Sequence, residues 1–281
     1  MQVFEQPAKL LDFLHNHRLN SRKIGLVPTM GALHEGHMSL FERSRKENEV
    51  TVGSIFVNPI QFNNPADLEK YPKPLEKDLK MLESIGCDAV FIPSVQLMYP
   101  SRPLININFG AMEHVMEGKF RPGHFNGVAI VVAKLFNIVQ PDRAYFGQKD
   151  LQQYLIIQQM VRDLSFQREL TACPIIREAD GLAMSSRNIR LSHEKRKVAC
   201  QLKAALDLAA SLVFNSPLGL IKEKVAEFLS RYPDISLEYF EIADNETLAE
   251  VKDVKAHNGI ALCIAAHLDG VRLIDNLLLI S

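Results

Sequence analysis

Residues 27–37 read Val-Pro-Thr-Met-Gly-Ala-Leu-His-Glu-Gly-His, and the rest of the chain is organised around this stretch. It follows the apolar run Ile24–Val27 and precedes a segment, 38–46, whose pattern predicts a helix. In a parallel α/β sheet, a loop between a strand and a helix lies at the carboxyl end of the strand, where ligands bind. Gly31 and Gly36 allow a close backbone approach, and a helix N-terminus attracts phosphate. The stretch therefore predicts a phosphate-binding loop.

His34 and His37 lie three residues apart in this loop, a spacing that places both imidazoles on one helix face. Two such donors suit a reaction in which negative charge builds on a phosphoryl group. A metal half-site and purely structural histidines are the alternatives. The spacing is one residue shorter than in zinc proteases, and no cysteine lies nearby to complete a structural zinc set. We therefore favour phosphate handling.

Composition excludes several classes of protein. The chain has 281 residues, of which 47% are hydrophobic and 23% charged, as in globular proteins with one large or two ordinary domains. A formal net charge of −1 provides no basic field for nucleic acid or an anionic membrane, so neither is expected as a partner. The scattered cysteines, the absence of a signal pattern and the lack of long apolar runs predict a cytoplasmic location.

Strand and helix patterns alternate up to about residue 176, which predicts βαβ units and a mostly parallel sheet. The expected strands are 24–27, 50–57, 89–92, 144–146 and 170–176, and the expected helices are 7–17, 38–46, 75–85, 128–138 and 151–164. After the polar loop 177–190 we expect helices at 192–214 and 216–231, then strands at 235–242, 260–267 and 271–279. Helices followed by strands predict a separate small α+β domain.

Polar residues follow several of the expected strands. Asn58 and Gln61 form an amide pair after the second strand, and amides can hold a hydroxyl or carboxylate in fixed geometry. Residues 121–128 read Arg-Pro-Gly-His-Phe-Asn-Gly-Val, a basic, glycine-rich loop before a helix, with His124 as a donor. An ordinary turn and a capped loop are the respective alternatives.

Two further stretches suit phosphate. Residues 147–150 read Gly-Gln-Lys-Asp, in which glycine permits close approach, Lys149 is a compact cation, and Asp150 can cap a helix or meet a ribose hydroxyl. Residues 183–188 read Ala-Met-Ser-Ser-Arg-Asn, and two hydroxyls with a guanidinium can close over a triphosphate. A polar linker is the alternative for the second stretch.

These motifs together resemble a known family. His-Glu-Gly-His at 34–37 is similar to the His-x-Gly-His signature of the nucleotidylyltransferase superfamily. The ten residues from Pro28 to His37 resemble the pantothenate synthetase (pantoate–β-alanine ligase) family. The strings at 57–62, 121–128, 146–153 and 184–188 are similar to that family as well. The resemblance covers essentially the whole chain.

The resemblance implies a Rossmann-like, parallel-sheet nucleotide-binding domain for ATP and pantoate at residues 1–176. A smaller C-terminal α+β lid domain follows at 177–281, and the family is commonly homodimeric. The implied reaction is an ATP-dependent condensation of pantoate with β-alanine to pantothenate. It passes through an enzyme-bound pantoyl adenylate and releases AMP and pyrophosphate, with Mg²⁺ accompanying ATP.

The resemblance also implies roles for individual residues. The implied catalytic residues are His34, His37, Lys149, Ser185, Ser186 and Arg187. The implied ATP contacts are Pro28, Thr29, Met30, Gly31, His34, His37, Gly147, Lys149, Asp150, Met184, Ser185, Ser186 and Arg187. The implied pantoate contacts are Gln61, Gln153, Asn58 and His124, although His124 could instead support the loop. Asp78, in a segment that otherwise reads as solvated, is the candidate Mg²⁺ ligand.

Three other functions compete with this interpretation. An adenylyltransferase acting on a phosphorylated acceptor is disfavoured because the amides of Gln61 and Gln153 suit a hydroxy acid better than a phosphate. A nucleotide-binding regulator would be expected to have lost a histidine, the lysine or the Ser-Ser-Arg loop. A class I aminoacyl-tRNA synthetase has a similar Lys-Met-Ser-Lys-Ser loop, but the near-neutral charge and the lack of room for an anticodon domain disfavour it.

Overall fold

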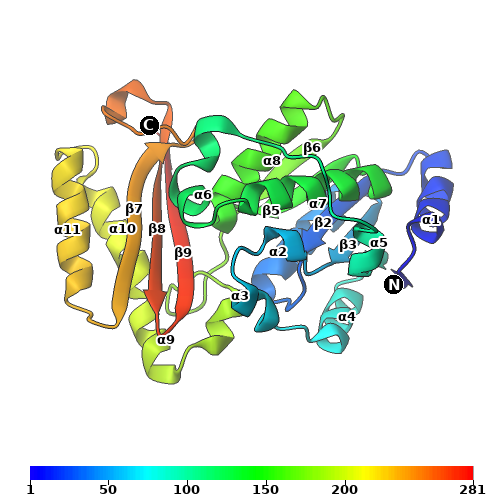
Figure 1. Ribbon diagram of the computed structural model, residues 1–281, viewed down its shortest axis with the longest axis horizontal. Coiled ribbons are helices and arrows are strands. Elements are labelled where there is room, and N and C mark those ends of the chain that lie inside the picture. The colour runs from blue at the N-terminus through cyan, green and yellow to red at the C-terminus, as the bar shows by residue number, and fades with distance from the viewer. Residues whose placement is uncertain (281) are drawn as a thin grey trace. The chain divides into compact units, whose positions relative to one another are not determined.

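The computed structural model describes residues 1–280, which form two compact units (Figure 1). The first unit comprises residues 1–109, 120–148 and 156–174. The second comprises 110–119, 149–155 and the chain from 175 onward. The division after residue 174 lies close to the boundary expected after 176, but two earlier segments also group with the C-terminal unit.

The first unit is built on a six-stranded parallel sheet with the order β1-β4-β3-β2-β5-β6. The strands are β1 (Gln2–Phe4), β2 (Ile24–Thr29), β3 (Val50–Ile55), β4 (Ala89–Phe91), β5 (Arg143–Gly147) and β6 (Glu169–Cys173). β2 pairs with β3 on one side and β5 on the other, so the strand order reverses at β2. Ligands bind at such a switch point, outside the carboxyl ends of the strands.

Helices cover this sheet because its central strands are apolar on both faces. α2 (Glu35–Glu47) packs on β2, β3 and β5, and α7 (His124–Val139) packs on β2 and α1 (Figure 1). The remaining helices of the unit are α1 (Pro7–Leu19), α3 (Pro65–Glu69), α4 (Leu75–Ser84), α5 (Val95–Met98) and α8 (Leu151–Asp163) from Ile156 onward. The predicted parallel α/β architecture is confirmed.

The second unit contains an antiparallel sheet of β7 (Ile235–Asp244), β8 (Gly259–Leu268) and β9 (Val271–Ile280). α10 (Gln201–Leu212) and α11 (Leu218–Ser230) pack on one face, where Leu262 and Ile264 contribute to the core. The intervening residues Ala261 and Cys263 pack instead with Met116, Leu151 and Leu155. β8 is therefore buried on both faces, and the segments 110–119 and 149–155 cover the second one.

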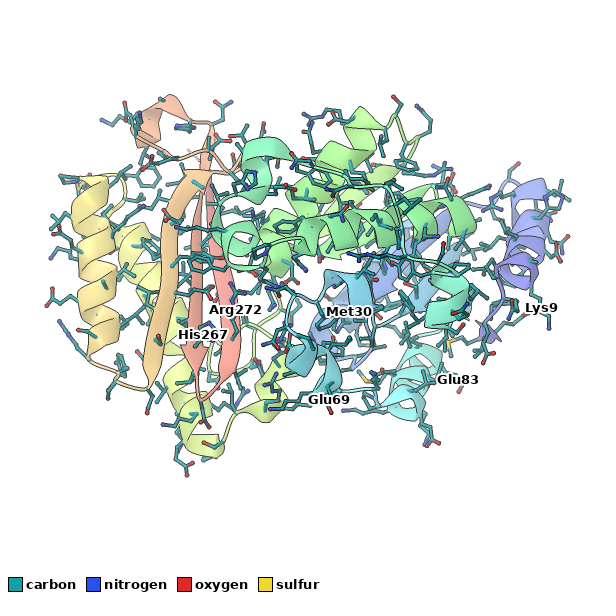
Figure 2. The ribbon with its side chains drawn as sticks, viewed as in Figure 1. Lys9, Met30, Glu69, Glu83, His267 and Arg272 are labelled. Atoms are coloured by element: carbon teal, nitrogen blue, oxygen red, sulfur yellow. The ribbon has the colours of Figure 1, made fainter. Side chains whose placement is uncertain are left out.

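An ion-pair network also holds the segment 110–119, which contains part of α6 (Met116–Phe120), within this unit. Figure 2 labels Arg272, which lies on β9. Arg272 donates to both carboxylate oxygens of Glu117, at 2.6 Å each, and also to Glu238. Tyr239 donates to Glu117 at 2.9 Å. The network and the apolar contacts together explain why a segment so early in the chain belongs to the C-terminal unit.

Most predicted elements are present, with local differences. The strand β1 and the short helices α3, α5 and α6 were not predicted, because three to five residues are too few for a pattern. The strand expected at 170–176 ends at Cys173, since Pro174 cannot donate to the sheet. The helix expected at 192–214 is divided into α9 (His193–Ala199) and α10. No helix in the described part of the chain is long and apolar enough to cross a membrane.

Candidate active site

The loop after β2 has a shape that a buried carboxylate maintains. Gly31 and Ala32 are both left-handed, with φ of +79° and +51°. Asp78, in the first turn of α4, is only 1% exposed. Its two oxygens accept the backbone N–H groups of Ala32 and Leu33, at 2.8 Å each. A Cβ at position 31 would lie 3.0 Å from Asp78 Oδ2, so glycine suits both the backbone angle and the space.

This loop presents the two histidines at the start of α2. His34 is the N-cap residue, and the ring centroids of His34 and His37 lie 4.1 Å apart. The Nδ1 atoms of both rings are buried, whereas the residues as a whole are partly exposed. A ligand that reaches the rings would therefore meet Nε2 as their polar atom. Nε2–H donors beside a helix N-terminus form a site for an anion.

The amide pair after β3 belongs to a hydrogen-bonded cluster. Asn58 Nδ2 donates to Gln61 Oε1 at 2.9 Å and to the Gly127 carbonyl at 3.0 Å. Because a carbonyl can only accept, these contacts orient the amide, and Tyr99 donates to Asn58 Oδ1 at 2.8 Å. Burial raises the pKa of Tyr99, which keeps this hydroxyl a neutral donor. Asn58 therefore orients the Gln61 side chain by donating to its amide oxygen.

Gln61 contacts both neighbouring loops. Its Nε2 lies 3.1 Å from the Met30 sulfur, in the loop that carries the histidines. Its backbone carbonyl accepts from His124 Nδ1 at 2.9 Å, and His124 is 5% exposed. This contact is consistent with loop support, one of the two roles that the sequence left open for His124. Residues predicted from three separate motifs thus meet within the first unit.

Gly127 allows α7 to approach this cluster closely. A Cβ at this position would lie 2.5 Å from the Ile60 carbonyl oxygen and 2.7 Å from the Gln61 Cα. No real Cβ tolerates such distances, so any side chain at 127 must displace the turn η1 (Pro59–Gln61). The second glycine of the Arg-Pro-Gly-His-Phe-Asn-Gly-Val string, Gly127, is therefore required by close packing against Gln61, the residue predicted to bind pantoate.

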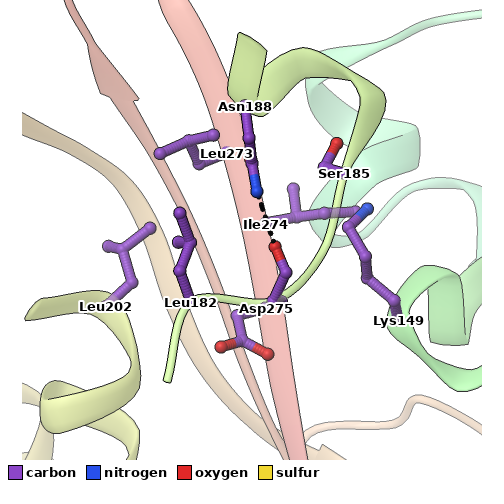
Figure 3. Close-up of a pocket in the computed structure, with 9 residues that line it drawn as sticks. Lys149, Leu182, Ser185, Asn188, Leu202, Leu273, Ile274 and Asp275 are labelled. Atoms are coloured by element: carbon purple, nitrogen blue, oxygen red, sulfur yellow. Dashed lines mark hydrogen bonds between the residues drawn. The ribbon is translucent and has the colours of Figure 1, made fainter. Parts of the chain in front are cut away.

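The second unit contains the other predicted phosphate contacts. Lys149 and Asp150 lie in the turn η3 (Gln148–Asp150) directly after β5, and Lys149 Nζ is 3.5 Å from Asp150 Oδ1. Ser185 caps the turn η4 (Ser186–Arg190), with its Oγ accepting from Arg187 N at 3.2 Å. Lys149 and Ser185 line the same small pocket (Figure 3). The structure thus brings together two motifs that lie 36 residues apart.

Of the two adjacent glutamines on α8, the sequence motif favoured Gln153, which is partly exposed. Gln152, which was not singled out, is 5% exposed and holds the segment 110–119. Its Oε1 accepts from Glu117 N at 2.9 Å, and its Nε2 donates to the carbonyls of Met112 and Val115. Adjacent helical residues point about 100° apart, so a pair of glutamines is itself a signal that one faces inward.

The described residues contain no cluster of three or more His, Cys, Asp or Glu side chains that could hold a metal ion. Asp78, the candidate Mg²⁺ ligand, already uses both oxygens to bind backbone amides. Mg²⁺ usually needs only one or two carboxylates when phosphate and water complete its octahedron. An ion held mainly by phosphate and water would fit this donor set.

A parallel sheet whose strand order reverses at β2, with a histidine pair at the helix start that follows, is typical of Rossmann-like nucleotide-binding proteins. The pantoate-beta-alanine ligase family model matches residues 2–278, and the chain belongs to that family. The resemblance identified from the motifs is thereby confirmed.

Similar curated proteins and solved structures support the same family assignment. The chain is 47% identical over 269 residues to the pantothenate synthetase of Cytophaga hutchinsonii, covering 95% of each chain. It is 48% identical over 260 residues to that of Bacteroides fragilis, covering 92% of each. The structure is similar to pantothenate synthetase from Thermus thermophilus, with TM-score 0.91, 42% identity and 99% of each chain covered.

A further similar structure is the pantoate-beta-alanine ligase of Francisella tularensis, complexed with beta-gamma ATP and beta-alanine. It has a TM-score of 0.82 and 35% identity, and the match covers 99% of this chain and 97% of that one.

Proposed function

We propose that this protein condenses pantoate with β-alanine to form pantothenate, in an ATP-dependent reaction through an enzyme-bound pantoyl adenylate. The contact between Gln61 and Met30 carries this proposal. It places an amide suited to a hydroxy acid beside the loop that is suited to phosphate. The family match over nearly the whole chain and the ATP complex of the Francisella tularensis relative support the same reaction.

In the first step, a carboxylate oxygen of pantoate attacks the α-phosphorus of ATP. The bond from that phosphorus to the bridging oxygen breaks, and pyrophosphate leaves with the electron pair. We infer that His34 and His37 donate through Nε2 to the phosphoryl oxygens as charge develops, while the N-terminus of α2 contributes its dipole. Gln61, Gln153, Asn58 and His124 would contact pantoate. Asn58 and His124 also hold Gln61 in place through their hydrogen bonds.

Other assigned residues would bind the nucleotide. We infer that Pro28, Thr29, Met30, Gly31, Gly147 and Asp150 contact ATP, with Met184 beside the Ser-Ser-Arg loop. Lys149, Ser185, Ser186 and Arg187 would neutralise the triphosphate. Mg²⁺ would enter with ATP and lower the charge of the leaving pyrophosphate. We further infer that residues 177–281 form a lid domain, which follows the nucleotide-binding domain of residues 1–176 along the chain.

In the second step, the neutral amine of β-alanine attacks the pantoyl carbonyl carbon. The carbon–oxygen bond to phosphate breaks, AMP leaves with the electron pair, and the amine loses a proton as the amide forms. No covalent enzyme intermediate is required, so catalysis consists of positioning and charge stabilisation. From the resemblance we also infer a homodimer. From the composition and the near-neutral charge we infer a cytoplasmic protein that binds neither nucleic acid nor membrane.

The decisive experiment measures AMP and pyrophosphate release from MgATP with pantoate and β-alanine each present or omitted. We expect AMP release to need both substrates, and pantoate alone to support exchange between pyrophosphate and ATP. Inactivity with pantoate, together with ATP consumption in the presence of a phosphorylated acceptor, would instead identify an adenylyltransferase. ATP binding without turnover under every condition would identify a regulator.

A further inference from the structure

The hairpin that leads to Ser185 and the backbone of Lys149 are hydrogen-bonded to two consecutive residues of β9, Asp275 and Asn276 respectively. Asp275 and Asn276 are 4% and 3% exposed, and neither was singled out by any sequence motif. Successive side chains of a strand point to opposite faces, so a dipeptide can reach two segments on different sides of one strand. In Figure 3 the Asp275 carboxylate points away from Lys149.

Asp275 anchors the base of the loop that carries Ser185. Arg177 Nη1 and Nη2 donate to the two carboxylate oxygens of Asp275, at 2.6 and 2.9 Å. Arg177 lies at the start of a hairpin formed by residues 176–184. Within it Arg177 forms an antiparallel bridge with Ala183, and Met184 N donates to the Ile176 carbonyl at 3.0 Å. A bidentate ion pair of this kind restricts both the position and the orientation of the arginine side chain. The hairpin directly before Ser185 is therefore held in place by the ion pair between Arg177 and Asp275.

The loop is also braced at its far end. Asn188 Nδ2 donates to the Ala183 carbonyl and to Glu178 Oε1, both at 3.1 Å, and Asn188 N donates to the Ser185 carbonyl at 3.0 Å. Ser185, Ser186 and Arg187 are thus enclosed between a hairpin fixed to Asp275 and a buried asparagine. Their placement depends on one strand of the small sheet.

Asn276 provides the corresponding contact for the other segment. Its Nδ2 donates to the backbone carbonyl of Lys149 at 2.9 Å. This carbonyl belongs to the turn η3, which has a single turn and provides little rigidity by itself. The asparagine therefore limits where the backbone of Lys149 can lie, and with it the origin of the lysine side chain.

We propose that Asp275 and Asn276 are positioning residues that hold Lys149 and the Ser185–Arg187 loop as one preassembled triphosphate-binding half-site. Preassembly lowers the entropic cost of ordering two segments when the nucleotide binds. This inference rests on the proposed function, because it assumes that both segments bind the phosphates of ATP. It predicts a defect in nucleotide use rather than a general loss of folded protein.

The test uses the full chain and the pantoate-dependent exchange of pyrophosphate into ATP. Asn276→Ala removes the donor, and Asn276→Asp keeps the shape but turns an acceptor toward the Lys149 carbonyl. Asp275→Asn weakens the clamp on Arg177. The matched control is Val225→Ala, which opens a cavity on α11 in the same unit, where Val225 is fully buried among the core residues.

We expect Asn276→Ala to raise the KM for MgATP about 5- to 10-fold, as the loss of one hydrogen bond implies. Asn276→Asp and Asp275→Asn should raise it at least as much. Val225→Ala should lower the urea midpoint while leaving that KM within twofold of the wild type. A wild-type KM for MgATP in both Asn276 variants would overturn the proposal. So would an equal rise in Val225→Ala, because the effect would then be one of stability.

The wild-type protein separates this inference from the proposed function. If the unaltered chain shows no pantoate-dependent exchange, the proposed function fails, and the proposal about Asp275 and Asn276 fails with it. If the wild type is active and the Asn276 variants match it, only the positioning inference fails.

Discussion

Replacing Asp78 by alanine tests whether this carboxylate shapes the histidine loop or serves mainly as a ligand for Mg²⁺. In the structure its oxygens accept two buried N–H groups, from Ala32 and Leu33. Each buried amide that loses its acceptor costs about 1–3 kcal/mol. We expect Asp78→Ala to lower the free energy of unfolding by about 3–5 kcal/mol.

The assay is urea unfolding followed by far-ultraviolet circular dichroism, since the chain contains no tryptophan. Glu76→Ala is the matched control, because Glu76 lies in the same first turn of α4 and is exposed. It should cost no more than about 1 kcal/mol, the usual contribution of an acidic residue near a helix N-terminus. Asp78→Asn should be intermediate, since its amide retains one acceptor and directs a donor toward the other N–H.

The reasoning would be refuted by an Asp78→Ala protein as stable as Glu76→Ala. If such a variant also regained activity as the Mg²⁺ concentration was raised, the metal-ligand interpretation of Asp78 would be the correct one. If Asp78 instead holds the histidine loop in position, Asp78→Ala should lose stability and show a defect in activity that added Mg²⁺ does not reverse.

Four further predictions follow from the site and its surroundings. His37→Ala and Lys149→Ala should each lower the rate of pantothenate formation by orders of magnitude while circular dichroism stays native; near-normal turnover would remove them from the mechanism. Gly127→Ala should raise the KM for pantoate at least several-fold, because its Cβ would displace the turn that carries Gln61, and an unchanged KM would contradict that packing argument. Although burial opposes the shift, hydrogen bonds from Thr247 and His257 lower the pKa of Asp244 to about 2. Its folded pKa thus lies below the unfolded value, so it contributes about 1–2 kcal/mol above pH 4 that disappears toward pH 2. The stability difference between wild type and Asp244→Asn should shrink over that range, and a constant difference would count against the assignment. Burial raises the pKa of Cys87 and of Cys263 to about 12, so a thiol reagent at pH 8 should modify neither until urea unfolds the chain; rapid labelling of either in the native protein would refute this.

The sequence by itself determined the succession of elements and the position of the polar loops. Alternating apolar and helical patterns are local properties, and so are the glycines and histidines that follow a strand, because they depend on neighbours a few residues away. For this reason the parallel α/β architecture, the small C-terminal α+β domain and the family could be identified from the chain. The same local signals misplaced the end of β6 and missed β1.

Only the tertiary structure decided which distant segments meet. Asp78 binds amides 45 and 46 residues earlier, and Asn276 binds a carbonyl 127 residues earlier. Gly127 fits against a turn near residue 60, and the segments 110–119 and 149–155 cover a face of the small sheet. Local propensity contains no information about such partners, because they are selected by burial and hydrogen-bond satisfaction across the whole fold. The sequence therefore indicated the residues suited to the chemistry, whereas the fold decided which residues hold them in place.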